Sequence, residues 1–531
     1  MTKENTNNAK PDQTKPDQTK PDQAKEDQAG TGQVLEAARR EKLRRIEELG
    51  FDPYGGRFDD HQSIDSIRNM ADQIVTEPLP QTAPDPNARP QQPHQSGPKV
   101  RAAGRIILQR KKGKLIFLDI WDWTGKIQVL IGANQVGETN WELAQCFDLG
   151  DIIGVDGELM LTRTGELSIA ASGLTFLSKS IETPPAKFHG LTDPDLRSRM
   201  RYMDLVHTEG VLERMLRRTK IVHSVRATLA GEGFVEVEGP TLHTIAGGAA
   251  ARPFTTHHNA LNIPLVLRIA LELHLKRLLV GGMERVYEMG RVYRNEGIDQ
   301  KHNPEFTMLE VYQAYGDCRS MMDLAEKIIV DALKATGQDL IIKWNGQSIN
   351  FTPPFARRTY DSLVEEYAGV DPVNREAVIE RAKSLGIDVV GKHFDLVKNE
   401  LFEECVEDKL IDPVFVTDYP ASICPLTKRR RDNPEIADRF ELFVQGVELA
   451  NAYTELNDPD LQEALFSKQL EGQKTDETMA KMDKDFIRAL RHGMPPAGGL
   501  GIGIDRLCMF LTDTAAIREV ILFPLQRPEV L

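Results

Sequence analysis

The 531-residue sequence contains only five cysteines, and no two of them form a Cys-x-x-Cys pair. This spacing argues against a zinc knuckle or a disulfide framework and favours a reducing cytoplasm. No apolar run approaches the roughly 20 residues that span a bilayer, so we expect no membrane segment. The first ten residues, MTKENTNNAK, have no apolar core, so we also expect no secretory signal.

Basic residues are fewer than acidic ones, and the formal net charge of −14 argues against general polyanion binding. Two local groups of cations nevertheless stand out. Residues 99–114 contain seven basic side chains and no acid. An expected helix carries the second group, Arg39, Arg40, Lys42, Arg44 and Arg45. An acidic protein can bind RNA through such patches.

Composition divides the chain into five parts. Residues 1–32 carry four five-residue repeats with almost no apolar surface, which predicts a disordered tail. Residues 33–99 combine a basic helix, ended by Gly50, with a proline-rich linker. In residues 100–181, five short apolar segments separated by glycines predict a small Greek-key barrel, the OB-fold.

The last two parts are a connector at residues 182–210 and a large domain at residues 211–531. An amphipathic helix is expected over residues 212–229. Beyond it, strands and helices alternate without βαβ periodicity. This pattern predicts an α+β protein whose large domain has a mainly antiparallel sheet flanked by helices.

Residues 290–312 hold the densest group of charges and predict a β-hairpin, because apolar-rich segments flank a turn region. Arg294 lies beside carboxylates and close to Phe306 in this segment. A guanidinium, carboxylates and an aromatic ring suit a substrate that carries phosphates, a metal and a flat base.

Two further clusters lie closer to the C-terminus. Glu441 and Glu448 would lie on paired strands across a turn, where two carboxylates suit Mg²⁺; two surface glutamates on a hairpin are the alternative. Residues 498–503 match neither a P-loop nor a Rossmann fingerprint, and their Gly-x-Gly-x-Gly pattern predicts a strand that another backbone or a ligand approaches closely. Arg506 would then lie near a helix N-terminus, which favours anions.

Together these clusters resemble the three motifs of class II aminoacyl-tRNA synthetases. Residues 233–240 resemble the first motif, which forms the dimer interface in that class. Residues 294–297 with 302–306 resemble the second motif, and residues 501–506 resemble the third. A closer resemblance is to the lysyl-tRNA synthetase family, whose signatures are similar to residues 187–190, 201–205, 247–260 and 268–273.

The resemblance implies a cytoplasmic homodimer that makes lysyl-adenylate and pyrophosphate from L-lysine and ATP. Lysine would then pass to the 3′-terminal ribose of tRNA(Lys). Arg294 and Arg506 would be catalytic, the first at the carboxylate and α-phosphate and the second at the γ-phosphate. The implied ATP-binding residues are Arg294, Glu296, His302, Phe306 and Arg506. More than one Mg²⁺ per subunit is expected, with Glu441 and Glu448 as ligands.

The same resemblance implies a lysine pocket and an anticodon site. The pocket residues would be Gly248 and Glu272 at the α-amino group, Glu310, Tyr312 and Glu455 at the ε-ammonium, and Asn451 and Tyr453 along the wall. A buried ammonium requires carboxylate partners, which agrees with this assignment. In the barrel, the residues that match anticodon contacts are Arg110, Phe117, Gln128 and Glu166. Phe117 would stack on a base, and a place in the barrel core is its alternative.

The sequence departs from the family pattern at a few positions. Leu271 and Ala246 stand where the family usually has proline, and both changes affect loop stiffness. Tyr453 stands where many members have phenylalanine, and it adds a hydroxyl to the expected lysine pocket. None of these changes removes a charged group, so we still expect an active enzyme.

Three competing interpretations fit the sequence less well. An aspartyl- or asparaginyl-tRNA synthetase would need a pocket without the acids Glu310 and Glu455. A non-catalytic tRNA-binding protein derived from a synthetase would be expected to lack Arg294, Arg506 or the glutamate pair, all of which are present. A protein lysyl-transferase that acts on an elongation factor is disfavoured by the complete barrel with Phe117.

Overall fold

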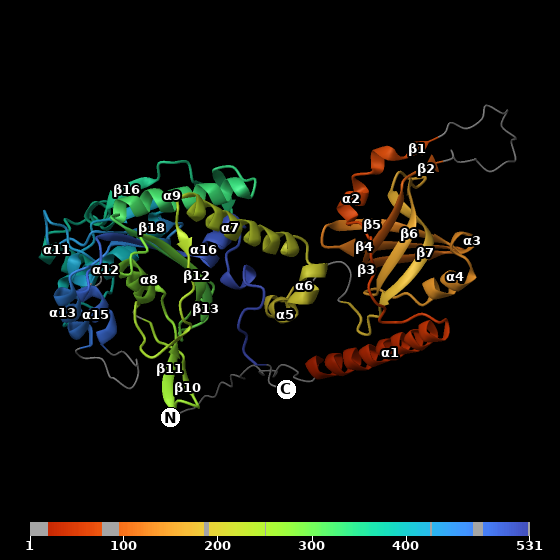
Figure 1. Cartoon of the computed structure of the whole chain (residues 1–531), viewed down its shortest axis with the longest axis horizontal. Coiled ribbons are helices and arrows are strands. Elements are labelled where there is room, and N and C mark those ends of the chain that lie inside the picture. The colour runs from red at the N-terminus through yellow and green to blue at the C-terminus, as the bar shows by residue number, and fades with distance from the viewer. Residues whose placement is uncertain are drawn as a thin grey trace, which may run out of the picture. The chain divides into compact units, whose positions relative to one another are not determined.

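A computed structural model of the chain describes residues 20–76, 95–184, 191–249, 251–424, 427–470 and 482–528. The chain divides into two compact units, Met1–Gly190 and Leu191–Leu531, whose elements are labelled in Figure 1. The first repeats of the tail, most of the proline-rich linker and the motif expected at residues 187–190 lie outside the described residues.

A closed five-stranded barrel forms the centre of the first unit and confirms the predicted OB-fold. Its strands pair in the order β3-β4-β5-β7-β6, and only β5 and β7 among these neighbours are parallel. Side chains alternate along each strand, so that Ile116, Leu118 and Ile120 of β4 fill the interior. The strands are β3 (Lys99–Lys112), β4 (Leu115–Asp122), β5 (Gly125–Gly132), β6 (Ile152–Leu161) and β7 (Leu167–Ser178). Smaller elements are α2 (Ile64–Arg68), β1 (Val75–Thr76), β2 (Gln95–Ser96), α3 (Ala133–Val136) and α4 (Glu138–Gln145).

Helix α1 (Lys20–Glu48) confirms the predicted basic helix but begins earlier than expected. The prediction of disorder up to residue 32 is therefore wrong for residues 20–32. Pro21 lies in the first turn, where its missing N–H is tolerated, and the Ala, Lys, Glu and Gln residues that follow favour a helix. Gly50, with a φ of +83°, follows the last turn as expected.

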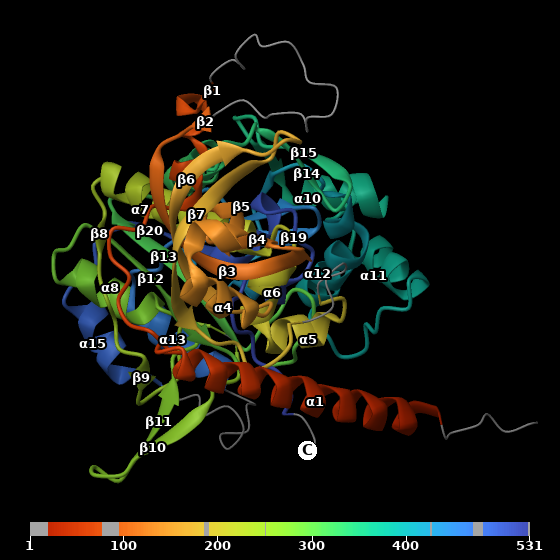
Figure 2. The ribbon, with the colours of Figure 1, turned by 90° about the vertical axis from the view of Figure 1, so that its right-hand side faces the viewer.

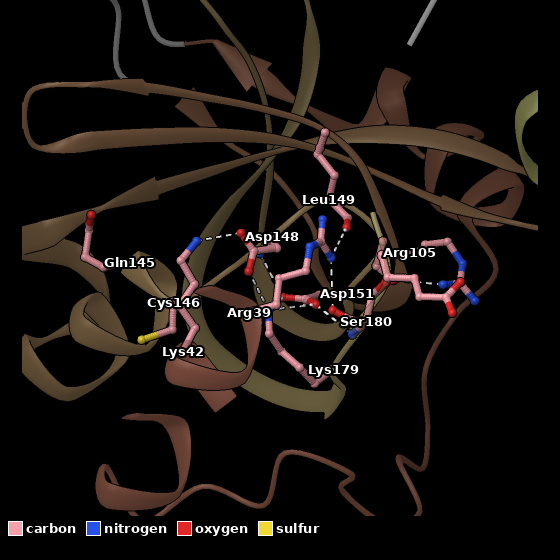
Figure 3. A network of polar contacts seen from close by, with 12 residues as sticks. Arg39, Lys42, Arg105, Gln145, Cys146, Asp148, Leu149, Asp151, Lys179 and Ser180 are labelled. Atoms are coloured by element: carbon pink, nitrogen blue, oxygen red, sulfur yellow. Dashed lines mark hydrogen bonds and ion pairs between the residues drawn. The ribbon is translucent and has the colours of Figure 1, made fainter. Parts of the chain in front are cut away.

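Buried charged side chains attach α1 to the barrel (Figure 3). The Lys179 ammonium lies 2.7 Å from Asp148 and 2.9 Å from Asp151, and the side chains of Lys179 and Asp151 are both fully buried. Lys42 of α1 contacts the second oxygen of Asp148 at 2.5 Å. Hydrogen bonds from Lys179 and Lys42 hold the pKa of Asp148 below its ordinary value despite the burial of this carboxylate, which keeps it charged.

Arg39 makes the second attachment of α1, since its guanidinium donates to the backbone oxygens of Leu149 at 3.0 Å and Ser180 at 2.9 Å. The other arginines of the helix are more exposed, and each is paired with an acid: Arg40 with Glu36, Arg44 with Glu41, and Arg45 with Glu48 and Glu142. The positive charge of the basic helix is therefore largely compensated within the first unit. Its contact with tRNA phosphates stays a prediction.

An eight-stranded sheet organises the second unit (Figure 1). The strand order is β16-β17-β18-β19-β20-β13-β12-β8, and the neighbours are antiparallel except β16–β17 and β12–β8. This arrangement confirms the predicted α+β domain with a mainly antiparallel sheet. The strands are β8 (Val235–Glu236), β12 (Arg285–Tyr293), β13 (Glu305–Ala314), β16 (Ala356–Thr359), β17 (Val414–Thr417), β18 (Arg439–Val444), β19 (Val447–Thr454) and β20 (Ala497–Gly503).

Helices α7 (Val211–Gly231), α9 (Cys318–Ala335) and α16 (Ile504–Leu511) share one core with the sheet, and α7 confirms the predicted amphipathic helix. A second core joins α8 (Glu272–Val280) and α15 (Lys484–Arg491) to β12 and β13. A third core includes α10 (Tyr360–Leu363), α11 (Arg375–Ser384) and α12 (Phe394–Cys405) with β17 and β18. Among the described residues, no helix has the length and apolar character required to cross a membrane.

The remaining elements of the second unit are short. The strands β9 (Leu242–His243), β10 (Thr255–His258) and β11 (Ile263–Leu267) form a small separate sheet, and the β10–β11 hairpin projects outward (Figure 2). A further hairpin pairs β14 (Ile341–Trp344) with β15 (Gln347–Asn350), and α13 (Pro459–Leu470) precedes α15.

Residues 191–210, predicted to belong to a connector, are part of the second unit. They form α5 (Pro194–Arg199) and α6 (Arg201–His207). The fully buried Arg201 pairs with Asp204 at 2.5 Å and donates to the backbone oxygens of Leu522 and Arg518 at 3.1 and 2.9 Å. The family motif at residues 201–205 thus attaches these helices to the end of the domain.

We predict that Arg39→Ala loosens α1, because it removes two hydrogen bonds from a buried guanidinium. Each charged hydrogen bond contributes about 1.5–3 kcal/mol, so the expected loss in unfolding free energy exceeds 1 kcal/mol. The exposed Arg40→Ala is the matched control, since its pair with Glu36 contributes about 0.3–0.5 kcal/mol. Hydrogen–deuterium exchange of α1 measures both effects, and equal protection in the two variants would contradict the anchoring role of Arg39.

Candidate functional site

Strand β20, in the centre of the sheet, has one face without side chains. Gly499, Gly501 and Gly503 alternate with Leu500 and Ile502, which are buried in the sheet core. Because side chains alternate along a strand, the three glycines lie on one face. This arrangement agrees with the prediction that a ligand approaches the glycine-rich strand closely.

Polar side chains from the two neighbouring strands surround this face. Glu310 and Tyr312 of β13 and Asn451 and Tyr453 of β19 are in register with Gly501 and Gly499, respectively. A methyl group on Gly499 would come within 2.7 Å of Tyr312 and would also collide with Glu455. The register thus brings four of the seven predicted lysine-binding residues beside Gly499 and Gly501, and a fifth, Glu455, approaches Gly499 so closely that only glycine fits there. We call this side-chain-free face of β20 the hollow.

Glu310 is buried at one side of the hollow and is held by two hydrogen bonds. The backbone N–H of Leu271 donates to one carboxylate oxygen at 3.0 Å, and the Tyr312 hydroxyl donates to the other at 3.2 Å. Burial raises the pKa of Glu310 to about 7, and the nearby Glu272 acts in the same direction. Such a carboxylate gains from a cationic ligand, which would replace the missing solvation.

Glu455 and Glu272 lie on the other side of the hollow and share a partner that the sequence did not single out. The ammonium of Lys276 lies 2.5 Å from Glu272 and also contacts Glu455. Glu455 Oε1 is buried, and within the described part of the chain it has no hydrogen-bond partner. The i, i+4 spacing of Glu272 and Lys276 on one helix was the available signal.

Gly248 completes the predicted lysine-binding set. Its φ is +86°, and a methyl group there would lie 3.0 Å from Ala270 and 3.4 Å from Glu272. The backbone therefore approaches Glu272 closely, at a position that disfavours any side chain. This geometry places a backbone amide and a carboxylate together, which is the pairing expected for an α-amino group.

A β-bulge brings Glu448 to the same face as Asn451. In simple alternation, Glu448 would point with Ala450 into the core, but the register shifts between Leu442 and Phe443. Glu448 is therefore opposite Phe443, and Asn451 is opposite Glu441, so all four side chains lie on one face. The Asn451 amide donates to Glu448 at 2.8 Å.

A cavity of about 300 Å³ lies beside the hollow and is lined by all five predicted ATP-binding residues. Arg294 follows β12, and its guanidinium lies 5.2 Å from the centre of the Phe306 ring. Phe306 is half-buried at the start of β13, with one side packed against the core. Glu296 is exposed at the rim of the cavity. A flat base and a chain of phosphates fit this combination of an aromatic face and cations.

Arg506 and His302 both line this cavity and lie close together. Arg506 lies in the first turn of α16 and donates to the backbone oxygen of Glu448 at 2.6 Å. His302 Nε2 lies 3.4 Å from the Arg506 guanidinium, and its Nδ1 lies 2.8 Å from Asp299. Both side chains lie near a helix N-terminus, which favours an anion.

Asp505 is a structural residue that positions the start of α16, next to Arg506. It is almost fully buried, contacts Arg218 of α7 and accepts a hydrogen bond from the backbone of Thr307 at 2.7 Å. Helices α7 and α16 and strand β13 are therefore tied together directly beside Arg506. The sequence predicted the helix start at Asp505 but not this role.

Glu441 already has two partners, Arg439 and the hydroxyl of Tyr419, which donates at 2.8 Å. The Arg439 guanidinium lies between two aromatic rings, 4.5 Å from the ring centre of Tyr419 and 5.2 Å from that of Tyr453. Burial raises the pKa of Glu441, against the effect of Arg439, and the charge of Glu448 adds to the rise. Two repelling carboxylates on one face suit a divalent cation, although no group of three or more potential ligands occurs among the described residues.

The predicted anticodon residues lie on the outer face of the barrel. Phe117 is half-exposed between the buried Ile116 and Leu118, so its alternative place in the core is excluded. Arg110 is directly opposite Phe117 on the neighbouring strand. An aromatic face beside a guanidinium is the arrangement that stacks a base next to a phosphate.

Glu166 is exposed and Gln128 is buried, and an acid that the sequence did not single out lies beside them. Asp119 is opposite Gln128, and the Ser168 hydroxyl donates to Gln128 at 3.0 Å. Burial raises the pKa of Asp119, Arg110 opposes this rise, and Glu166 adds to it. Arg110 and Glu166 both affect the pKa of Asp119. These two predicted anticodon residues therefore lie in one patch.

Comparison with known proteins identifies the family of this chain. The profile of the class II tRNA synthetases (D, K and N) matches residues 193–527, and that of the OB-fold nucleic acid binding domain matches residues 100–177. The lysine–tRNA ligase of Moorella thermoacetica is 47% identical over 501 residues, which are 93% of this chain and 98% of the relative. The lysine–tRNA ligase of Thermoanaerobacter pseudethanolicus is 48% identical, over 92% of this chain and 95% of the relative. That of Streptococcus pneumoniae is 46% identical, over 92% of this chain and 97% of the relative. The chain therefore belongs to the class II tRNA synthetases (D, K and N) and, among them, to the lysine–tRNA ligase family.

Proposed function

We propose that this protein activates L-lysine with ATP and transfers it to tRNA(Lys). The observation that carries this proposal is the hollow above β20, where buried carboxylates lie beside a cavity suited to a nucleotide. One oxygen of Glu455 is buried there and has no hydrogen-bond partner in the described residues. Leaving a buried acceptor unsatisfied costs about 1–3 kcal/mol, so a ligand with an ammonium group would restore that energy.

Lysine fits the hollow with one charge at each end. Its ε-ammonium would lie among Glu310, Tyr312 and Glu455, and its α-amino group would lie between Glu272 and the backbone of Gly248. Asn451 and Tyr453 would form the wall. Aspartate or asparagine would instead place a carboxylate or an amide among acids, so the pocket argues against those substrates.

Catalysis would depend on positioning and charge rather than on a covalent enzyme intermediate. A lysine carboxylate oxygen attacks the α-phosphorus, the bond to the bridging oxygen breaks, and pyrophosphate leaves. Arg294 would bridge the two reacting anions, and Arg506 with His302 would hold the far phosphates. The ribose hydroxyl of tRNA then attacks the carbonyl carbon, and AMP leaves with the electron pair of the broken bond.

Glu441 and Glu448 would hold Mg²⁺, which neutralises phosphate charge when bound. Arg439 and Tyr419 fix the orientation of Glu441, and Asn451 fixes that of Glu448. Such partners orient ligands in the way that metal sites require. The family resemblance implies more than one ion per subunit.

The barrel would bind the anticodon of tRNA(Lys), with Phe117 stacked on a base and Arg110 beside it. We also propose a homodimer in the cytoplasm. In support of dimerisation, Val235 of the edge strand β8 and Leu242 of β9 are each about half exposed, within and next to the segment that resembles the first class II motif. Exposed apolar side chains of this kind favour an interface.

ATP–pyrophosphate exchange tests the proposed activation step. Because the hollow selects an ammonium group, we expect exchange with lysine to exceed exchange with arginine, asparagine and aspartate by at least about 100-fold. Exchange driven by aspartate but not by lysine would refute the proposed substrate.

We predict that Glu310→Gln raises the KM for lysine at least about thirtyfold, since truncating a buried charge pair costs about 2–5 kcal/mol. The KM for ATP should change little. Because the pKa of Glu310 is raised to about 7 in the free protein, the wild-type KM for lysine should rise as pH falls below 7, where this carboxylate takes up a proton.

The Glu310→Gln variant should lose part of the pH dependence of the KM for lysine. The control is Glu305→Gln on the same strand, where an exposed acid is 3.7 Å from Arg291. Equal losses for lysine and ATP in Glu310→Gln would contradict the pocket role of Glu310.

We predict that Phe117→Ala weakens tRNA binding by about 1–3 kcal/mol, the contribution of one stacked base, and leaves ATP–pyrophosphate exchange unchanged. Trp123→Ala is the control, since Trp123 is exposed in the same barrel and no contact with tRNA is proposed for it. Aminoacylation at varied tRNA concentration measures the difference. Loss of exchange together with charging would show that Phe117 supports the fold instead.

A further inference from the structure

Lys276 lies among the groups proposed to bind lysine, and no step of the proposed reaction uses it. Its side chain is fully buried, and its ammonium contacts both Glu272 and Glu455. These carboxylates are the ones proposed for the α-amino group and the ε-ammonium of the substrate. The protein's own ammonium group therefore bridges the binding groups for both substrate ammoniums.

The charges of the pocket match those of the substrate only when Lys276 is included. The pocket has three buried carboxylates, Glu272, Glu310 and Glu455, and one buried ammonium, that of Lys276, which contacts Glu272 and Glu455. When all four are ionised, two negative charges remain in excess, and free lysine carries two ammonium groups. The substrate carboxylate would have its own partner in Arg294. Because a buried charge without compensation is strongly unfavourable, this match bears directly on which ligand binds.

We propose that Lys276 is a positioning and specificity-determining residue that adjusts the charge of the hollow to the two ammonium groups of lysine. The inference rests on the proposed function and deepens it. Lys276 also orients Glu455, because it holds one carboxylate oxygen and leaves Oε1 without a hydrogen-bond partner among the described residues. Without Lys276, the two ammonium groups of lysine would compensate only two of the three carboxylates. The third would then have to keep a proton when lysine binds.

The other ionisable groups around α8 do not change this balance between the three carboxylates and Lys276. Strand β13 contributes Glu310 and Tyr312, and strand β19 contributes Tyr453 and Glu455. The acids that α15 and β12 contribute are paired elsewhere: Asp483 and Asp485 with Arg277, and Glu288 with Arg268. Burial opposes the charge of Lys276, but Glu272 and Glu455 raise its pKa above the ordinary value, so it remains an ammonium at neutral pH.

The test is the pH dependence of the KM for lysine in ATP–pyrophosphate exchange by the full-length protein. For the wild type we expect a KM that is constant above about pH 7.5 and rises below about 7, where Glu310 takes up a proton. Lys276→Met removes the internal cation, which raises the pKa of the remaining carboxylates. We therefore expect the rise to begin at least about one pH unit higher, with an approximately tenfold higher KM at about pH 7.5. The KM for ATP should be unchanged.

Lys398→Met is the matched control. Lys398 is also a buried lysine, 2.5 Å from Asp361, but it lies in the core of α10 and α12, and its removal should leave the pH profile of the KM for lysine in place. Lys276→Gln is a second variant that removes the positive charge. It should shift the pH profile of the KM for lysine in the same direction as Lys276→Met.

A KM raised by the same factor at every pH would assign Lys276 a packing role and overturn the proposal, as would an unchanged KM. Loss of folding in both Lys276 variants would likewise make it a structural residue. Failure of the wild type to use lysine would refute the proposed function itself, whereas normal wild-type exchange with an unshifted variant profile refutes only the role of Lys276.

Discussion

The proposed lysine pocket depends on one strand that has no side chains on one of its faces. Gly499 and Gly501 leave the hollow, and Leu500 and Ile502 on the other face hold the strand in the core. A glycine in a strand interior weakens the strand by about 0.5–1 kcal/mol relative to alanine. Strand β20 tolerates this loss because it pairs along its length with β13 and β19. The same pairing positions the polar residues on both sides of the hollow.

Burial divides the site into two regions with different chemistry. The proposed lysine end is buried, and its acids have specific partners there: Glu310 has Leu271 and Tyr312, and Glu455 has Lys276. The proposed ATP end is more open, and its cations would contact phosphates. Charges interact more strongly where water is excluded, so the buried end can select a ligand by charge. The open end can instead admit a large, mobile and highly charged molecule.

Much of the fold could be predicted because its signals are local. Glycine-separated strands predicted the barrel, and alternation with a turn predicted the hairpins that carry Arg294 and Glu441. Long-range charge pairing could not be predicted in this way. Nothing in the sequence singled out Lys276, and the basic residues of α1 suggested an RNA-binding patch, although Arg39 is buried against the barrel. The early start of α1 has a weak signal in the sequence, because its first turns lack the apolar residues that mark an amphipathic helix.

The β-bulge in β19 shows why spacing in the sequence does not by itself define a site. Glu448 and Asn451 are three residues apart, so regular alternation would place them on opposite faces. The extra residue reverses this parity, and Glu448 then contacts Asn451 with one oxygen while the other lies 3.8 Å from Arg506. Asn451 belongs to the proposed lysine wall and Arg506 to the proposed phosphate site. Glu448 therefore connects the two regions physically, and any change in its position on metal or phosphate binding would reach the lysine wall through a single hydrogen bond.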